Sequence, residues 1–207
     1  MMKRIVAQVA VIIVGATALF GLGGVSNLLA GRDLLSRPGT ADTVSQVDSL
    51  QGELKVTRAE LERAHQVLEF SGRYGIPGDL SARIYDNAVA EGIPPAIGFQ
   101  LVNVESRFQN GVQSGASAIG LTQLRLPTAR AYDATVAASD LMNPDVNLRI
   151  GFRYLKDLLK RFDQDVALAL EAYNKGPTFI AAQQDSGSVV KGRYSQAVMS
   201  STPRRKG

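Results

Sequence analysis

The sequence has no cysteine and no tryptophan, and its only histidine is His65. Without cysteine the chain can form neither a disulfide framework nor a thiolate metal site. One histidine alone argues against a zinc site and against a serine–histidine triad. We therefore predict that the protein uses no metal and no cofactor. The absence of tryptophan leaves tyrosine and phenylalanine as the aromatic side chains available to stack on a ligand.

The chain also lacks a run of basic residues interleaved with aromatic ones, a pattern that is typical of nucleic-acid surfaces. Its formal net charge is only +4 at pH 7. A modest positive charge suits an anionic polymer, but nothing in the pattern selects DNA or RNA. We expect no nucleic-acid partner.

Residues 1–30 differ in composition from the rest of the chain. Lys3 and Arg4 precede an apolar run from Ile5 to Leu22, which approaches the roughly 20 residues that a membrane span needs. The segment is either a retained signal anchor, which we favour, or a cleaved signal peptide. In both cases the remainder is exported. We predict a protein of the cell envelope, anchored in the inner membrane or released to the periplasm or beyond.

Residues 31–71 contain a linker followed by a helical stretch with heptad spacing. Apolar residues recur every seven positions from Val47 to Leu68. This spacing predicts an amphipathic helix, and two alternatives remain open for it. The helix is either a single helix that lies on its own domain or acts as a spacer, or a coiled coil that forms a homodimer through residues 44–70.

Residues 72–200 are predicted to form an all-α domain, and residues 201–207 a basic tail. Apolar residues along this stretch follow helical periodicity, and no strand is strongly indicated. Residues 109–120 are rich in Gly, Ser and Asn and predict a loop. Helices are expected at residues 79–91, from Pro94-Pro95 to Phe108, and near 127–133, 144–162, 164–174 and 189–199.

Glu105 is the carboxylate best placed for acid–base chemistry. It lies at the edge of an apolar stripe formed by Ile97, Leu101 and Phe108, near the end of its helix. Partial burial and the negative end of the helix dipole both oppose the ionised form. A raised pKa would keep the group protonated near neutral pH, as a general acid requires. The alternative is an ordinary surface glutamate.

Three blocks in order resemble the soluble lytic transglycosylase family. They are Glu105–Phe108, Gly120–Leu124 and Ala172–Asn174. The spacing from Glu105 to Gln123 also matches the family pattern, and the likeness covers roughly residues 75–180. The resemblance implies a lysozyme-like α fold. It also implies roles for six residues: Glu105 as catalytic acid, Ser106 as its support, Ser114 and Gln123 as substrate contacts, Tyr173 over the reacting sugar, and Asn174 shaping the site.

Three residues depart from the family pattern. Thr122 replaces a methionine, Arg125 replaces an apolar residue, and Ser117 stands where glycine is common. Arg125 either meets a peptide carboxylate of the substrate or is a solvated surface arginine. These changes affect the expected fit of a sugar groove but leave the acid in place.

The resemblance implies cleavage of the β-1,4 bond between N-acetylmuramic acid and N-acetylglucosamine in peptidoglycan. The product would carry a 1,6-anhydromuramic end, so one carboxylate suffices. Asp133, Asp140 and Asp145 are predicted to be turn or capping residues rather than a second catalytic acid. Two alternatives are a lysozyme-type hydrolase of the same fold and a non-enzymatic envelope protein that binds glycan or acts as a scaffold.

Overall fold

The computed structural model describes residues 40–113, 117–187 and 192–200. The chain divides into two compact units between Thr57 and Arg58, and each is considered by itself. The predicted signal anchor at residues 1–30 and the basic tail at 201–207 lie outside the described residues. Within the described ranges, no helix combines the length and apolar character that a membrane crossing requires.

Helix α2 (Thr40–Tyr74) contains the stretch with heptad spacing, so the prediction of a helix there is confirmed. It continues through Gly72 and ends at Tyr74, just before Gly75. Gly75 has a φ of +65°, a left-handed conformation that glycine adopts without steric cost.

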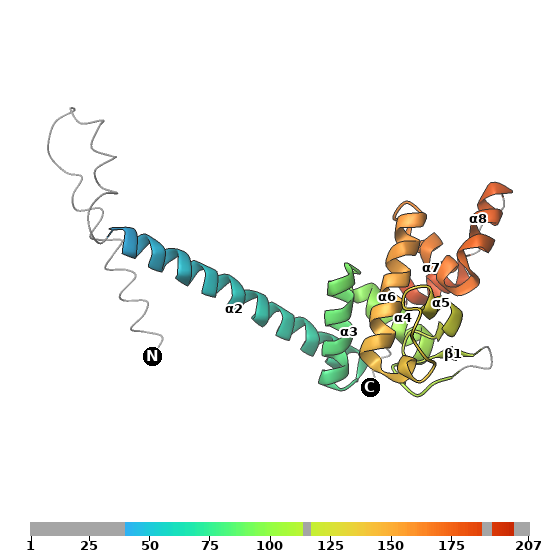
Figure 1. Ribbon diagram of the computed structural model, residues 1–207, viewed down its shortest axis with the longest axis horizontal. Helices are drawn as coiled ribbons and strands as arrows, with labels where there is room; N and C mark the ends of the chain where they lie inside the picture. Colours follow the sequence, from blue (N-terminus) through green and yellow to red (C-terminus); the bar gives the residue numbers. More distant parts are fainter. Residues whose placement is uncertain (1–39, 114–116, 188–191, 201–207) are drawn as a thin grey trace, which may run out of the picture. The chain divides into compact units, whose positions relative to one another are not determined.

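The unit that begins at Arg58 is mainly helical (Figure 1), as predicted. Two very short strands, a 3-10 turn and helix α8 were not anticipated. The elements are α3 (Gly78–Glu91), α4 (Pro95–Ser106), β1 (Ala118–Ile119), β2 (Leu124–Arg125), α5 (Leu126–Arg130), η2 (Asp140–Met142), α6 (Pro144–Arg161), α7 (Val166–Lys175), α8 (Pro177–Asp185) and α9 (Arg193–Met199).

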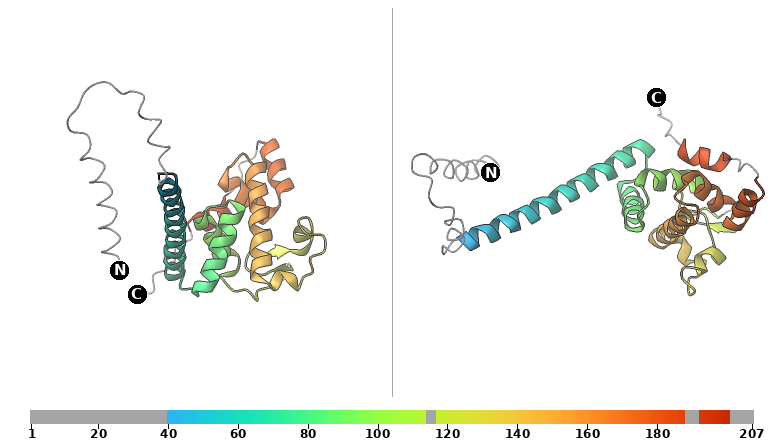
Figure 2. Two further views of the ribbon diagram at one scale, coloured as in Figure 1. Left: turned by 60° about the vertical axis from the view of Figure 1, so that its left-hand side comes forward. Right: turned by 90° about the horizontal axis from the view of Figure 1, so that it is seen from above.

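Helix α6 lies at the centre of this unit. It packs against both α3 and α7, and α7 in turn packs against α8 and α9 (Figure 2). Side chains of α6 pack into two apolar clusters. Leu148, Phe152 and Leu155 belong to the larger one, with α3, α4, α7 and α9. Ile150 belongs to the smaller one, beside the two strands and α5.

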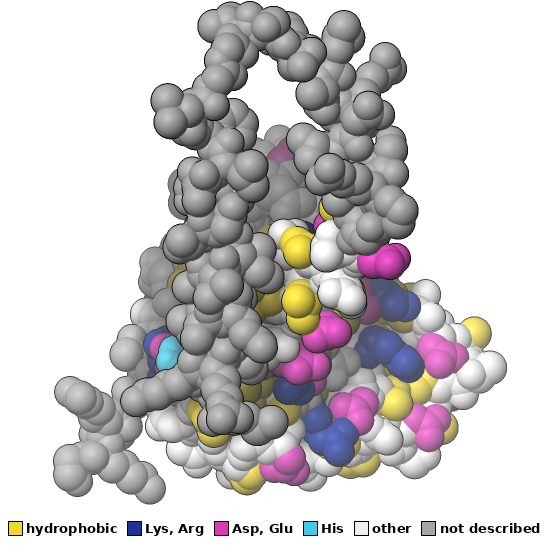
Figure 3. Space-filling model, turned by 90° about the vertical axis from the view of Figure 1, so that its left-hand side faces the viewer, with side chains coloured by type: hydrophobic (Ala, Val, Ile, Leu, Met, Phe, Trp, Pro, Cys, Tyr) yellow, Lys and Arg dark blue, Asp and Glu magenta, His cyan; other side chains and the backbone are white. Residues whose placement is uncertain are grey.

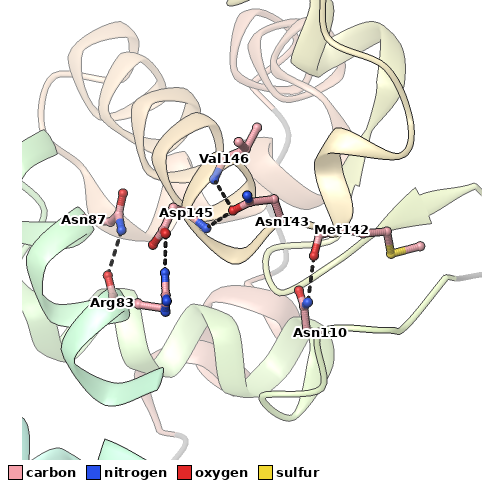
Figure 4. Close-up of polar contacts among 7 residues, drawn as sticks. All are labelled: Arg83, Asn87, Asn110, Met142, Asn143, Asp145 and Val146. Atoms are coloured by element: carbon pink, nitrogen blue, oxygen red, sulfur yellow. Dashed lines mark hydrogen bonds and ion pairs between the residues drawn. The ribbon is translucent and has the colours of Figure 1, made fainter. Parts of the chain in front are cut away.

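The first turn of α6 is held by polar contacts that Figure 4 shows. The Asn143 side chain accepts hydrogen bonds from the backbone N–H groups of Asp145 and Val146, so it caps the helix. The Asp145 carboxylate pairs with Arg83 of α3. An acidic residue in the first turn also complements the helix dipole. The cap thus satisfies backbone N–H groups at the start of α6, and the exposed ion pair links that end of the helix to α3.

The apolar surface of α4 differs from the predicted stripe. Phe99, Leu101 and Val102 are buried, whereas Ile97 is only partly buried. Helix α4 ends at Ser106, so Phe108 lies beyond it, with a left-handed φ of +63°. The stripe was wrong at this end because Arg107 and Phe108 already form the turn that leaves the helix.

The end of α2 belongs to the same compact unit as the later helices. Phe70 is buried and stacks on Phe99, with ring centroids 4.1 Å apart. Ser81 donates a hydrogen bond to the Val67 carbonyl over 2.8 Å. These contacts join the end of α2 to the later helices within the unit that begins at Arg58.

A buried asparagine ties the loop between the strands to α6. The Asn147 side chain is fully buried, and its Oδ1 accepts from the Thr122 backbone N–H at 2.8 Å and from the Thr122 hydroxyl at 2.7 Å. Its Nδ2 donates to the carbonyls of Ile119 at 2.8 Å and Leu141 at 3.0 Å. One side chain thus satisfies buried polar groups from three segments, which would otherwise each cost free energy.

Two glycines make this approach sterically feasible. A Cβ atom at Gly120, where φ is +78°, would lie 2.3 Å from Asn147 Nδ2. A Cβ atom at Gly151 would lie 2.3 Å from the Thr122 hydroxyl oxygen. The Gly120–Gln123 turn can therefore lie directly on the surface of α6.

We expect Asn147→Ala to lower the free energy of unfolding by about 3 kcal/mol or more, because several buried backbone groups lose their partner at about 1–3 kcal/mol each. Urea unfolding followed by tyrosine fluorescence measures this. Asn87→Ala is the matched control, since its side chain bonds only the Arg83 carbonyl on the surface of α3. Equal stability losses in the two variants would contradict the role assigned to Asn147.

Candidate active site

A cleft of about 520 Å³ lies over the turn that Asn147 holds in place. Glu105, Gln123, Arg125 and Thr128 supply polar groups to its wall. Tyr154 and Tyr173 supply aromatic surface, and the segment 174–177 lines another part. Three blocks that are far apart in the sequence thus meet around one space.

Glu105 lies in the last turn of α4 and is the sole carboxylate among the described residues that line the cleft. Burial raises the pKa of the Glu105 carboxyl to about 7, and a hydrogen bond from Tyr194 offsets part of the rise. The predicted partial burial and raised pKa are confirmed. A carboxyl with this pKa is substantially protonated at neutral pH, so it can donate a proton.

Tyr194 of α9 donates its hydroxyl to Oε1 of Glu105. Burial raises the pKa of Tyr194 far above its usual value, and the neighbouring Glu105 charge raises it further. Tyr194 is therefore a permanent donor that steadies one carboxyl oxygen. Sequence reasoning missed it, because 89 positions separate the two residues and nothing local marks this tyrosine.

Tyr173 lies in the cleft wall as the sequence suggested. Its hydroxyl donates to the Thr122 carbonyl over 2.9 Å, and its ring centroid lies 5.0 Å from that of Tyr154. Burial raises the pKa of Tyr173 well above its usual value, with a smaller contribution from the Glu105 charge. The ring is thus held rigidly beside the acid. Asn174 follows at the exposed rim of the same cleft.

Gln123 also lines the cleft, but its side-chain amide has a structural partner. The Nε2 group donates to the carbonyls of Val112 at 3.0 Å and Gly120 at 2.9 Å. Gln123 has a left-handed φ of +47°. It therefore closes the turn and fastens it to the preceding loop, a role that its spacing from Glu105 did not reveal.

The two predicted serines have different outcomes. Ser106 is buried and donates to the Val102 carbonyl in its own helix at 3.1 Å. It is not among the described residues that line the cleft, and its hydroxyl is bonded within α4, so its support of Glu105 stays a prediction. Ser114 lies outside the described residues.

The three departures from the family pattern have structural explanations. Thr122 is fully buried, and its hydroxyl binds Asn147, so the position is filled by a polar contact. Arg125 is exposed and lines the cleft. Ser117 has a left-handed φ of +59°, a conformation that glycine adopts more easily.

The other aspartates named from the sequence have structural roles. Asp133 accepts from the backbone and hydroxyl of Thr135, and Asp140 accepts from the Ala137 backbone. Both close turns, as predicted. Asp145 pairs with Arg83 instead of capping α6. In the part of the chain that the structure describes, no group of three or more potential ligands could hold a metal ion.

Charge on the molecular surface is mixed. On the face shown in Figure 3, acidic and basic side chains of the described residues lie interspersed with apolar ones. Arg63 and Asp86, for example, form an exposed ion pair between α2 and α3. Such pairs contribute little to stability.

Solved structures of soluble lytic transglycosylases resemble this chain. The 70-kDa enzyme in complex with bulgecin A has a TM-score of 0.51 and 20% identity, over 64% of this chain and 22% of that one. The enzyme from Escherichia coli has a TM-score of 0.49 and 23% identity, over 57% and 20%. An inactive mutant of Slt from Pseudomonas aeruginosa has a TM-score of 0.46 and 30% identity, over 48% and 17%.

The match at 20% identity shows a shared fold, which confirms the lysozyme-like helical fold predicted for this unit. The chain spans about a fifth of the length of these proteins. A protein-family model, described as the transglycosylase SLT domain, matches residues 83–193. This segment contains Glu105, Gln123 and Tyr173, and it ends one residue before Tyr194. The match covers more than half of the sequence, and the chain therefore belongs to the transglycosylase SLT domain family.

Proposed function

We propose that this protein is a peptidoglycan lytic transglycosylase and that Glu105 is its catalytic acid and base. The proposal is supported by family membership and by the partly buried carboxyl in the cleft, whose pKa is raised to about 7. The single observation that carries it is the position of Glu105. It is partly buried, its pKa is raised to about 7, and it is the one acid among the described cleft residues.

The proposed reaction needs only this carboxyl. Protonated Glu105 gives its proton to the oxygen between N-acetylmuramic acid and N-acetylglucosamine as the bond from that oxygen to the anomeric carbon breaks. The resulting carboxylate takes the proton of the muramic 6-hydroxyl. That hydroxyl oxygen bonds to the anomeric carbon and closes the 1,6-anhydro ring. Glu105 ends protonated, so each cycle restores the acid.

The cleft residues have separate proposed roles in this reaction. Tyr173 provides a rigid wall for the reacting sugar, while Gln123 and Asn174 contact the substrate. Because Gln123 Nε2 is bonded to the backbone, we assign its substrate contact to the amide oxygen. Ser114 is proposed as a further substrate contact.

A hydrolase of the same fold is the second candidate. An ordinary glycosidase needs a second carboxylate as nucleophile or base. The cleft wall holds one carboxylate among its described residues, which favours the internal 6-hydroxyl over water as nucleophile. A non-enzymatic glycan-binding scaffold is the weaker alternative, since binding alone requires no buried acid.

We expect digestion of purified peptidoglycan to yield muropeptides that end in 1,6-anhydro-N-acetylmuramic acid, lighter by one water than hydrolysis products. Mass spectrometry of the digest measures this. Mainly reducing-end products would identify the protein as a hydrolase.

In the same assay Glu105→Gln should reduce cleavage by about 10²–10⁴-fold or more, because the amide cannot transfer the proton. Asp86→Asn is the matched control. It makes the same change at an exposed carboxylate that does not line the cleft. Near-normal digestion by Glu105→Gln would refute the assignment, provided that circular dichroism shows a folded protein.

We further propose that the enzyme acts in the cell envelope, held to the inner membrane through residues 1–30. Membrane fractionation with sequencing of the mature N-terminus tests this. A soluble protein that begins near residue 27 or 31 would mean a cleaved signal peptide.

Residues 44–70 are proposed to pair two copies of the chain. The heptad side chains Val47, Leu54, Leu61 and Leu68 are 49–69% exposed on α2, which supports this use. Sedimentation equilibrium should show that Leu61→Glu abolishes the dimer. Val56→Glu should not, since Val56 is equally apolar and exposed but lies off the heptad positions. A monomer before any substitution would exclude pairing.

A further inference from the structure

The buried carboxylate of Glu171 does not line the cleft, yet it contacts α9, the helix that carries Tyr194. Glu171 is on α7, two residues before Tyr173, and only 1% of its surface is exposed. A buried carboxylate needs both a charge partner and hydrogen bonds to offset the loss of water. Glu171 has two partners, of which one lies on its own helix and the other on α9.

Lys175, one turn later on α7, is the charge partner. Its Nζ lies 2.7 Å from Glu171 Oε2. The other oxygen, Oε1, accepts the backbone N–H of Ser195 at 2.8 Å. Ser195 immediately follows Tyr194 in the first turn of α9. The carboxylate therefore fastens the backbone next to Tyr194.

The contacts around Ser195 make this attachment specific. Ser195 is 1% exposed, and its hydroxyl donates to the Gly192 carbonyl at 3.0 Å. A Cβ atom at Gly192 would lie 2.8 Å from that hydroxyl oxygen and 3.9 Å from Glu171 Oε1. Gly192 is thus packed closely against the Ser195 hydroxyl, at the start of the helix that Glu171 contacts.

We propose that Glu171 is a positioning residue, whose carboxylate anchors the first turn of α9 and so holds the Tyr194 hydroxyl on Glu105. The proposal rests on the function proposed for Glu105 and extends it to the residue that controls its partner. Glu171 itself touches neither the cleft nor the reacting atoms among the described contacts.

The charged and titratable groups around these residues are few in the described structure. Tyr194 from α9 and Tyr173 from α7 face Glu105. Lys175 from α7 and Tyr194 from α9 face Glu171. Loss of the Tyr194 hydrogen bond makes ionised Glu105 less stable, so the pKa of Glu105 rises. Loss of the negative charge of Glu171 alone would instead make Glu105 easier to ionise.

Because the two effects move the pKa of Glu105 in opposite directions, a pH titration distinguishes them. The rate of peptidoglycan cleavage is measured against pH, and the Glu105 carboxyl is titrated by carbon NMR, a readout that does not need activity. In the wild type, activity should fall as the pH rises through about 7. Tyr194→Phe should move this midpoint upward by about one pH unit, the equivalent of one hydrogen bond to a charged group.

We expect Glu171→Ala to move the midpoint upward as well. In the Tyr194→Phe background it should cause no further rise, because both changes break one contact and only the opposite effect of the lost charge remains. Glu171→Gln keeps an oxygen for Ser195 and should restore a midpoint at or below that of the wild type. If Glu171→Ala does not fold, Glu171→Asp keeps the charge but is one methylene shorter, and it should give a smaller upward shift.

Glu91→Ala is the matched control for stability. Glu91 is also a buried glutamate with basic partners, Arg153 and Lys156, but it pairs α3 with α6. Its loss should lower stability without moving the midpoint.

A midpoint that is unchanged or lowered in Glu171→Ala, or an upward shift that adds to that of Tyr194→Phe, would overturn the proposal. If the wild type does not cleave peptidoglycan, the proposed function fails, while the NMR titration still tests the role of Glu171.

Discussion

The site depends on the contact between Asn147 and the Gly120–Gln123 turn. Asn147 has no surface exposure, and α6 carries it directly beneath the cleft. Its amide joins Ile119, Thr122 and Leu141 through four hydrogen bonds. The Thr122 carbonyl then accepts from Tyr173. A single satisfied amide therefore sets the distance between the turn and α7, and with it the width of the space beside Glu105.

Two opposing effects set the pKa of the Glu105 carboxyl. Burial raises its pKa because water no longer solvates the charge, whereas the Tyr194 hydroxyl stabilises that charge and lowers the pKa. The net result is a pKa of about 7, which suits the proton donation and acceptance that we propose for this group. The cleft supplies burial from α4 and α7, and α9 supplies the donor.

The sequence was sufficient to predict most helices and the partial burial of Glu105. Pro95 and Asn143 begin helices for local reasons, through proline at the first turn and a side-chain cap. Glu105 was identified because the blocks that accompany it are short and ordered. Helix α8 was missed because Gly176-Pro177 was taken as an end, although Pro177 is also the first residue of the next helix.

The remaining features of the site depend on contacts between distant segments. Nothing near Tyr194 or Glu171 distinguishes them from core residues, and their importance follows only from docking α9 on α4 and α7. This docking has a consequence for the order of events during synthesis. Glu105 emerges from the ribosome long before Tyr194, so a partly made chain already contains the acid but not its partner. The Glu105 carboxyl reaches its final pKa only after α9 has been synthesised and has packed against α4 and α7.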